Sequence, residues 1–408
     1  MSETLAAYFT RHDAGRVAAL LPVRYHRMQT DAFAFFRGSA PLYYERFGAD
    51  ERLCASPTGW LCGDAHVENF GSYKGDNGLV YFDVNDFDEA LRGPILWDVG
   101  RLIVSVLLAA DHFGLPAAER HAAARETLAT YAATLATGKA YLLERATATG
   151  VIRQLLKAVA HRSPRKLLVG RASRRNGWHL RDIPTLFALP AAEHAAVRAA
   201  FETWRSAQPL PPCGAVLDVA QRVVGVGSLG VPRYVVLAEH RHSRKLPILI
   251  DLKMAPPAAA SRCAGVPQPA WPAEAARVSQ CQTWLQAVPP APLLAIELLG
   301  QSFVLRTLQP VADKLDFDLT HGQAAFRTAL PDFARLLAWA HLRGSAHRGG
   351  AGPDALQEFG AGAAWQAGVL SFATDAVTQV GQDYRAFRAA CRTGALPTSA
   401  HPHPLVLA

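Results

Sequence analysis

The stretch WLCGDAHVENFGSYKGDNGLVYFDVNDFDEALRGPILWDVGRL, residues 60–102, carries the features that decide the fold of this chain. Short apolar runs such as LVYFDV alternate in it with Asp, Asn and Gly, a pattern that predicts strands separated by functional loops. Asn69 follows Asp64 by five positions, and Asp86 follows Asn69 by seventeen, directly behind the apolar run. The closing segment LWDVGRL predicts the start of a helix.

This spacing matches the spacing of kinase catalytic residues. In kinases an Asp on a catalytic loop accepts the proton of the substrate hydroxyl, an Asn five residues later holds one Mg²⁺, and an Asp behind the next strand holds the metal that bridges the phosphates. We therefore predict Asp64 as the catalytic residue and Asn69 and Asp86 as ligands of Mg²⁺, which prefers oxygen donors. An Asp- and Asn-rich turn without a ligand is the alternative. The further acids of the NDFDE segment favour the metal site, because they would repel one another without a cation or solvent.

Four further side chains are predicted to support this site. His66 lies inside the loop and is expected to contribute a hydrogen bond rather than to bind the metal. Asp88 belongs to the same acid cluster, and Asp98, at the start of the predicted helix, is expected to anchor the catalytic loop through backbone N–H groups. Arg37, in the FFRG segment, is a candidate for contact with an anion.

A glycine-rich segment follows much later, in VVGVGSLGVPRYVVL, where Gly225, Gly227, Ser228 and Gly230 form the pattern GxGSxG. In a dinucleotide-binding fold this pattern would open a helix, whereas here β-branched residues flank it on both sides. The pattern therefore predicts a loop between two strands, like the loop that covers the phosphates in kinases. Glycines allow close approach of the backbone and positive φ. An ordinary glycine-rich hairpin is the alternative.

Lys253 stands in the next apolar run, PILIDLKMA. A lysine among Ile and Leu is costly to bury without an anionic partner, and the phosphates of a nucleotide would supply one. The alternative is an edge-strand lysine whose ammonium group reaches solvent. In kinases a helix Glu pairs with this lysine. The candidates in the helix predicted at EAARVSQCQTWLQAV are Glu274 and Gln280, and the sequence does not decide between them.

The order of these segments predicts an α+β protein in three parts. Residues 1–208 are expected to form a largely helical lobe with the catalytic and metal-binding loops, including helices at 121–146 and 190–207. Residues 209–310 begin with the proline-rich PLPPCG and are expected to form a small antiparallel β lobe with the glycine loop and Lys253. Residues 311–408 are expected to complete the helical lobe, with a frayed tail after residue 400.

The composition is that of a folded protein, since half of the 408 residues are hydrophobic and 19% are charged. The net charge of +8 is concentrated in residues 161–175, which hold six Arg or Lys and no acid. This run predicts either a solvated face or contact with an acidic or phosphorylated substrate. Nucleic acid is an unlikely partner, because zinc-finger spacing and an aromatic platform are both missing.

The six cysteines are scattered without a CxxC pair, which predicts reduced thiols. No apolar stretch reaches the roughly 18 residues of a membrane span. We therefore expect a cytoplasmic protein without a membrane partner.

Ten ordered segments carry a resemblance to a known family. They are FAFFRG, GDAHVENFG, FDVNDFDEALRGPILWDVGRL, NGWHLRDIPTLF, RVVGVGSLGVPRYVVL, the Lys253 strand, RVSQCQ, FVLRTLQP with Lys314 nearby, AHLRG and DYRAFRAAC. With them the chain resembles the uncharacterised bacterial family called domain of unknown function 2252. That family is similar to the aminoglycoside and choline kinase branch of the kinase-like fold, which carries HGDxxxxN and DFxD motifs. Cys62 stands here in place of the leading His, and KMA replaces a lysine followed by an acid.

The chain order also differs from that of kinases, in which the glycine loop and lysine precede the catalytic and metal Asp. The resemblance therefore implies a circularly permuted, two-lobe kinase-like fold. We expect an ATP- and Mg²⁺-dependent phosphotransferase that acts on a small hydroxylated molecule. A nucleotide-binding pseudokinase with a sensing or scaffolding role and an AMP-transferring enzyme remain alternatives. Asp86 and Lys253 are expected to face each other across one cleft, with the glycine loop as its roof.

Overall fold

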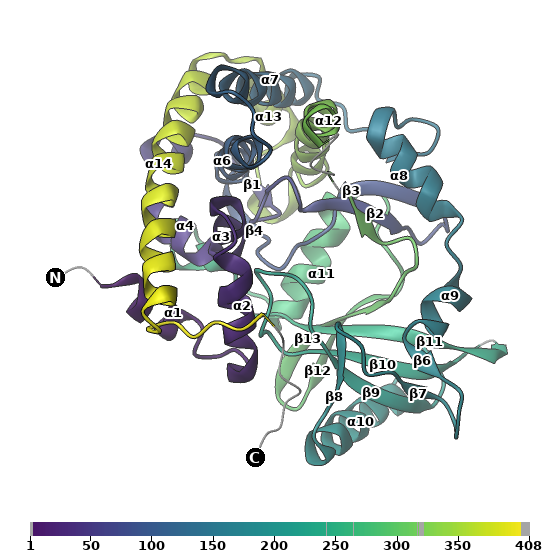
Figure 1. Ribbon diagram of the computed structural model, residues 1–408. Coiled ribbons are helices and arrows are strands. Elements are labelled where there is room, and N and C mark those ends of the chain that lie inside the picture. Colours follow the sequence, from purple (N-terminus) through teal and green to yellow (C-terminus); the bar gives the residue numbers. More distant parts are fainter. Residues whose placement is uncertain (1–2, 242, 264, 316, 318–321, 401–408) are drawn as a thin grey trace.

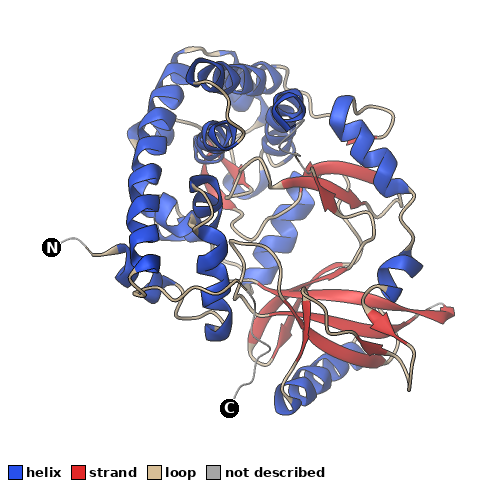
Figure 2. Ribbon diagram, viewed as in Figure 1, coloured by secondary structure: helices blue, strands red, loops and turns tan. Residues whose placement is uncertain are grey.

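The computed structural model describes residues 3–241, 243–263, 265–315, 317 and 322–400. It shows a mixed α+β protein with about 48% helix and 17% strand, in which the sheets are antiparallel. Most helices gather in one part of the molecule, and a six-stranded sheet forms the other (Figures 1 and 2). This agrees with the predicted α+β class.

The helical part is built around α6 (Leu96–His112), which is buried on nearly all sides because its sequence is apolar almost throughout. Helix α7 packs against α6, α12 and α13, and the long α14 packs against α6. The other helices of this part are α1 (Leu5–His12), α2 (Leu21–Met28), α3 (Ala32–Gly38), α4 (Ala40–Phe47), α5 (Glu51–Cys54), α7 (Ala117–Ala136), α8 (Gly150–Ala160), α12 (Gly322–Arg343), α13 (Pro353–Ala361) and α14 (Ala364–Arg392), with 3₁₀ turns η1 (Ala18–Leu20) and η3 (His347–Gly349).

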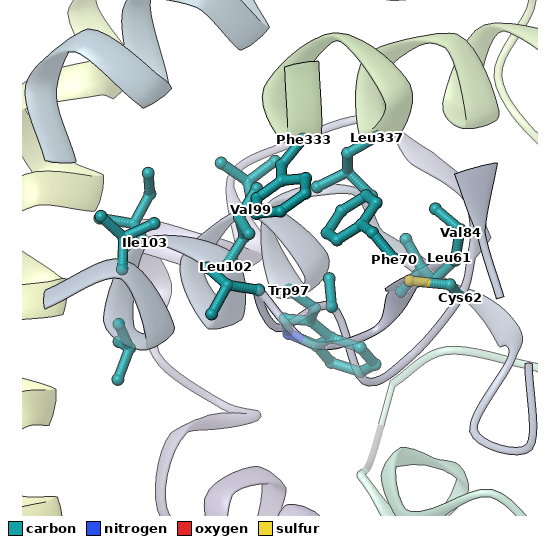
Figure 3. Close-up of a cluster of buried hydrophobic side chains, with 14 of the residues drawn as sticks. Leu61, Cys62, Phe70, Val84, Trp97, Val99, Leu102, Ile103, Phe333 and Leu337 are labelled. Atoms are coloured by element: carbon teal, nitrogen blue, oxygen red, sulfur yellow. The ribbon is translucent and has the colours of Figure 1, made fainter. Parts of the chain in front are cut away.

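Two small sheets frame the loops of the 60–102 stretch. β1 (Thr58–Leu61) pairs with β4 (Leu91–Pro94), and the second sheet has the order β14-β2-β3-β5, with β14 (Asp313–Lys314), β2 (Phe70–Lys74), β3 (Val80–Val84) and β5 (Leu143–Glu144). Loop 62–69 therefore leads into β2, and loop 85–90 leaves β3. Figure 3 shows the apolar cluster behind them, in which the ring of Phe70 stacks on Phe333 of α12 at 4.6 Å. This packing fixes the ends of the strands from which both loops emerge.

The large sheet has the order β12-β13-β11-β10-β9-β8, with antiparallel neighbours. Its strands are β8 (Leu186–Ala188), β9 (Val216–Arg222), β10 (Arg233–His240), β11 (Ser243–Met254), β12 (Leu293–Leu298) and β13 (Gln301–Thr307). Helix α10 (Ala191–Ser206) packs Val197 and Phe201 on one face. The other face is partly covered by α9 (Pro164–Val169) and the pair β6 (Ala172–Ser173) and β7 (His179–Leu180).

Between β11 and β12 the chain forms η2 (Ala259–Arg262) and α11 (Glu274–Leu285). Helix α11 contacts β12 and β13 of the large sheet and α12 of the helical part. It therefore links the two parts of the molecule beside the loops of residues 62–90 (Figure 1).

Several predicted elements are confirmed, including the helix at 190–207, observed as α10, and the two strands around the glycine loop, β9 and β10. The helix predicted at 121–146 is wrong at its end. α7 stops at Ala136 because Gly138 has a φ of 63°, which a helix cannot continue through. The basic run 161–175 forms α9 and β6, and its Arg162 pairs with Asp313 at 2.5 Å. The frayed tail predicted after residue 400 lies outside the described residues.

All six cysteines are unpaired, as their scatter predicted. None of the helices in the described part of the chain is long and apolar enough to cross a membrane.

Candidate active site

The loop of residues 62–69, predicted to be the catalytic loop, is anchored by Asp98 of α6. Its carboxylate accepts hydrogen bonds from the backbone N–H groups of Cys62 at 2.8 Å and Gly63 at 2.9 Å. His341 of α12 lies 3.3 Å from the same carboxylate, and its other ring nitrogen contacts the hydroxyl of Tyr131 at 2.7 Å. The anchor expected of Asp98 is therefore present. It is reinforced by a buried His and Tyr that the sequence did not reveal.

Asp64 is held by a buried guanidinium group. Arg101 Nε donates to Asp64 Oδ1, and the guanidinium lies 4.2 Å from the ring centroid of Phe36 and 4.8 Å from that of Tyr43. Burial raises the pKa of Asp64 above its ordinary value, although Arg101 opposes the shift. One carboxylate oxygen is thus fixed, and the other lies 3.8 Å from His66 Nε2. A positioned carboxylate of raised pKa suits the acceptance of a proton.

His66 is a neutral side chain. Burial and the charge of Arg37 lower its pKa well below the ordinary value. Its Nδ1 accepts a hydrogen bond from the backbone N–H of Glu68 at 3.2 Å, so the ring proton sits on Nε2, which faces Asp64. Arg37 is paired with Glu68 at 2.6 Å. His66 therefore lies beside Asp64 as a neutral ring, at a distance too long for a hydrogen bond between them.

Asn69 joins the two loops. Its side-chain nitrogen donates to the backbone oxygens of Asp64 at 3.0 Å and Asp86 at 3.1 Å. Because the nitrogen is occupied in this way, the amide oxygen is the atom that remains for a cation. Asn69 thus fixes the loops relative to each other and presents a hard oxygen ligand at their junction.

Lys253 of β11 meets the acid cluster directly. Its ammonium nitrogen lies 3.2 Å from both carboxylate oxygens of Asp86 and also contacts Asp88. The side chain of Lys253 is 5% exposed and that of Asp86 is 49% exposed. Residues 167 positions apart in the chain therefore form one ion-pair group, and the predicted juxtaposition of Lys253 and Asp86 is present.

The two carboxylates of this group differ electrostatically. Burial alone would raise the pKa of Asp86. The positive charge of Lys253, with smaller contributions from Arg306 and Lys314, holds that pKa below the ordinary value. Burial and the neighbouring Asp86 raise the pKa of Asp88. Asp86 is thus the carboxylate that stays charged and accessible, as a metal ligand must.

The glycine loop joins β9 to β10 and is held by arginines from the N-terminal segment. Gly225 and Gly230 have φ of 85° and 90°, which favours glycine at both positions. Arg24 Nη1 donates to the carbonyls of Val226 at 2.6 Å and Gly227 at 2.9 Å. Arg16 and Arg27 donate likewise to the carbonyls of Leu229 and Gly225, both at 2.8 Å.

These arginines turn the loop carbonyls toward the N-terminal helices. Within the described part of the chain, the backbone N–H groups of Gly227 and Ser228 donate no hydrogen bond. Free N–H groups in a glycine-rich loop are suited to phosphate oxygens. The hydrogen bonds from Arg16, Arg24 and Arg27 were not predictable from the sequence, because these residues lie about 200 positions before the loop.

Two adjoining cavities open at this point. The larger, about 380 Å³, is lined by Asn69, Lys253 and the segment 306–309, which covers the end of β13 and the two residues after it. The smaller, about 100 Å³, is lined by Asp64, His66 and Arg37. Both are lined by the residues Asp86, Gly225, Ser228 and Lys314. The predicted catalytic residue thus lies on one side of the shared boundary, and the predicted nucleotide lysine lies on the other.

Lys314 and Glu89 are candidate functional residues to which the sequence analysis assigned no role of their own. Lys314 is the cation common to both cavities, and its ammonium group has no ion-pair partner among the described residues. Glu89 lines the smaller cavity, and burial raises its pKa to about 7. Lys314 accompanies a segment that carries the family resemblance and Glu89 belongs to the NDFDE acid cluster, but neither setting assigns the residue a role.

The helix α11 does not supply an acid to Lys253. Glu274 pairs with Arg277 at 2.6 Å, and Arg277 donates to the backbone carbonyl of Asp88 at 2.9 Å. Gln280 is not among the residues that line the two cavities, whereas Gln282 lines the larger one. In the described residues, the anionic partners of Lys253 are therefore Asp86 and Asp88, not a helix residue.

The oxygen donors at the boundary suit Mg²⁺. Asp86 and Asp88 offer carboxylates and Asn69 an amide oxygen, whereas Mg²⁺ commonly takes one or two carboxylates and completes its shell with water and phosphate. No group of three or more His, Cys, Asp or Glu in the described part of the chain has the geometry of a metal site. A metal held partly by its phosphate ligand fits this donor set better than a closed protein cage.

The chain belongs to a family described as an uncharacterized protein conserved in bacteria (DUF2252), whose model matches residues 16–390. The matched region includes the catalytic loop, the glycine loop and Lys253. Searches of curated proteins and of solved structures gave no match.

Proposed function

We propose that this protein is an ATP- and Mg²⁺-dependent phosphotransferase that acts on a small hydroxylated molecule and has a circularly permuted, two-lobe kinase-like fold. One observation carries the proposal. Lys253 reaches Asp86 at 3.2 Å under a glycine loop, although the two residues come from segments 167 positions apart. Either segment alone lacks half of a triphosphate site, and together they supply its metal carboxylates, its lysine and its phosphate loop.

The order of elements in the large sheet supports the proposal. The glycine loop joins β9 to β10, Lys253 follows on β11, and helix α11 comes next. Protein kinases have the same succession of glycine-rich loop, strand lysine and helix. The catalytic and metal loops come first in this chain, which is what a circular permutation of that succession would produce.

The residues have distinct roles in this proposal. Lys253 and the N–H group of Ser228 bind the phosphates in the larger cavity. Asp86 and Asn69 would hold Mg²⁺, which would neutralise charge on the phosphates. Asp64, fixed by Arg101, orients the acceptor hydroxyl in the smaller cavity and accepts its proton. Lys314, at the boundary, is positioned to stabilise charge on the transferred group.

The test is ATP turnover and nucleotide-induced stabilisation of the purified protein with Mg²⁺ and a panel of hydroxylated acceptors. We expect both, and we expect Asp64→Asn to abolish turnover but not binding. Asp76→Asn, an exposed Asp in the β2–β3 turn, is the control and should behave as wild type. Binding without turnover would favour a pseudokinase, and a product that gains AMP would favour AMP transfer. The absence of both stabilisation and turnover would refute the proposal.

A further inference from the structure

The part of the larger cavity that lies beyond Lys253 is unusually rich in arginine. Arg222 of β9, Arg233 of β10 and Arg306 of β13 all line it, and none of them lines the smaller cavity. They surround Asp251, which stands opposite Arg306 in the pairing of β11 with β13. Three guanidinium groups thus share one region of the cavity wall with a single buried carboxylate.

The charges in this region do not balance. Asp251 pairs with Arg222 at 2.8 Å and with Arg233 at 2.5 Å, so both of its oxygens are engaged. Arg306 is half-buried, and its guanidinium group has no ion pair or hydrogen bond within the described residues. Burial lowers the pKa of Arg222 to about 10, and repulsion by Arg233 and Arg306 contributes. Partly buried charge of this kind is costly unless an anion compensates it.

The position of Arg306 relative to Lys253 indicates which kind of anion could compensate the positive charge of Arg306. Asp251 precedes Lys253 by two residues on β11, so both face the same side of the sheet, about 7 Å apart along the strand. Arg306 is opposite Asp251 on the neighbouring strand. A ligand whose phosphates meet Lys253 therefore continues along this face toward Arg306, within reach of a short phosphate chain.

The side chains that line the larger cavity indicate which phosphoryl donor it can bind. A neutral base needs predominantly apolar walls with a few polar contacts. Guanidinium groups instead suit phosphate, which they bind through two parallel hydrogen bonds. We propose that the larger cavity binds a chain of phosphates that extends from Lys253 to Arg306. The donor is thus an inorganic polyphosphate or a nucleoside polyphosphate with more phosphates than ATP. This inference rests on the phosphotransferase function proposed above.

The test is isothermal titration with Mg²⁺ and three probes: inorganic tripolyphosphate, adenosine 5′-tetraphosphate and ATP. We expect at least one of the first two to bind wild type more tightly than ATP, and which of them does so identifies the source of the chain. Arg306→Met should lower the affinity for that probe about tenfold or more, since the substitution removes a charge-assisted contact. Arg125→Met, an exposed arginine of α7, is the matched control and should change affinity less than twofold.

A second readout does not depend on the ligand. Because the guanidinium group of Arg306 makes no ion pair or hydrogen bond within the described residues, Arg306→Met should fold and should raise the thermal midpoint of the ligand-free protein. Equal binding of all probes by Arg306→Met and wild type would overturn the inference. The inference would also be overturned if wild type bound neither phosphate-chain probe and Arg306→Met lost ATP binding. That result would indicate that the adenine base of ATP stacks on Arg306. In both cases the phosphotransferase proposal stands, whereas it fails if wild type binds none of the probes.

Discussion

Replacing Asp98 by Asn tests whether the catalytic loop depends on its buried anchor. The carboxylate accepts two backbone N–H bonds, from Cys62 and Gly63, at 2.8 and 2.9 Å. Asn keeps one acceptor oxygen, so one N–H group loses its partner and the other loses a charged acceptor. Each loss costs about 1 to 3 kcal/mol at a buried site. We therefore expect Asp98→Asn to lower the free energy of unfolding by about 3 kcal/mol.

The assay is urea denaturation followed by circular dichroism, with Asp354→Asn as a control. Asp354 is exposed in the first turn of α13, and its replacement should cost under about 0.5 kcal/mol. If Asp98→Asn does not fold, Ser105→Ala provides a milder test, because Ser105 Oγ accepts from the backbone N–H of Val67 at 3.1 Å. We expect about 1 to 2 kcal/mol for that change. Costs no larger than that of the control for both variants would refute the anchoring role.

Three further predictions concern the site. Lys314→Met should lower the turnover of a phosphotransfer assay at least tenfold while donor affinity changes less than threefold, and equal losses in both would contradict its place at the transferred group. Arg27→Met should speed hydrogen exchange of the glycine loop and weaken donor binding several-fold, since Arg27 holds the Gly225 carbonyl at 2.8 Å, whereas Arg125→Met should do neither. Because the pKa of His66 is depressed, the wild type should lose stability as pH falls below about 6.5, where the unfolded chain binds the proton. His66→Gln should lose less over that range, and parallel curves would exclude the neutral His66.

Local sequence patterns predicted the elements that carry the candidate site residues. The pattern around Asp64, Asn69 and Asp86 predicted strands separated by functional loops, because short-range periodicity and turn residues define such elements locally. The β-branched flanks of the glycine segment likewise predicted its place between two strands. The encounter of Lys253 with Asp86 followed from chemistry, since a buried lysine and an acid cluster each lacked a partner.

The partners that position these residues were not predictable in the same way. Arg101 lies in the apolar LWDVGRL segment, and nothing in its neighbourhood distinguishes a buried clamp for Asp64 from an ordinary helix arginine. Arg24 reaches the glycine loop from 202 positions away, and His341 reaches Asp98 from 243 positions away. Pairings over such separations depend on how helices pack, which local periodicity does not encode. The sequence does not predict the end of α7, because Gly138 lies inside an Ala-rich segment with helical periodicity.

The most direct test of the central claim is whether the two distant halves bind one ligand together. Isothermal titration of ATP with Mg²⁺ into wild type, Asp86→Asn, Lys253→Met and the double variant measures this. We predict that wild type binds, that each single change weakens binding at least tenfold, and that the double variant binds little worse than the weaker single variant, because both residues act on the same phosphates. Binding by Lys253→Met as tight as that of wild type, or fully additive losses in the double variant, would contradict a single shared site.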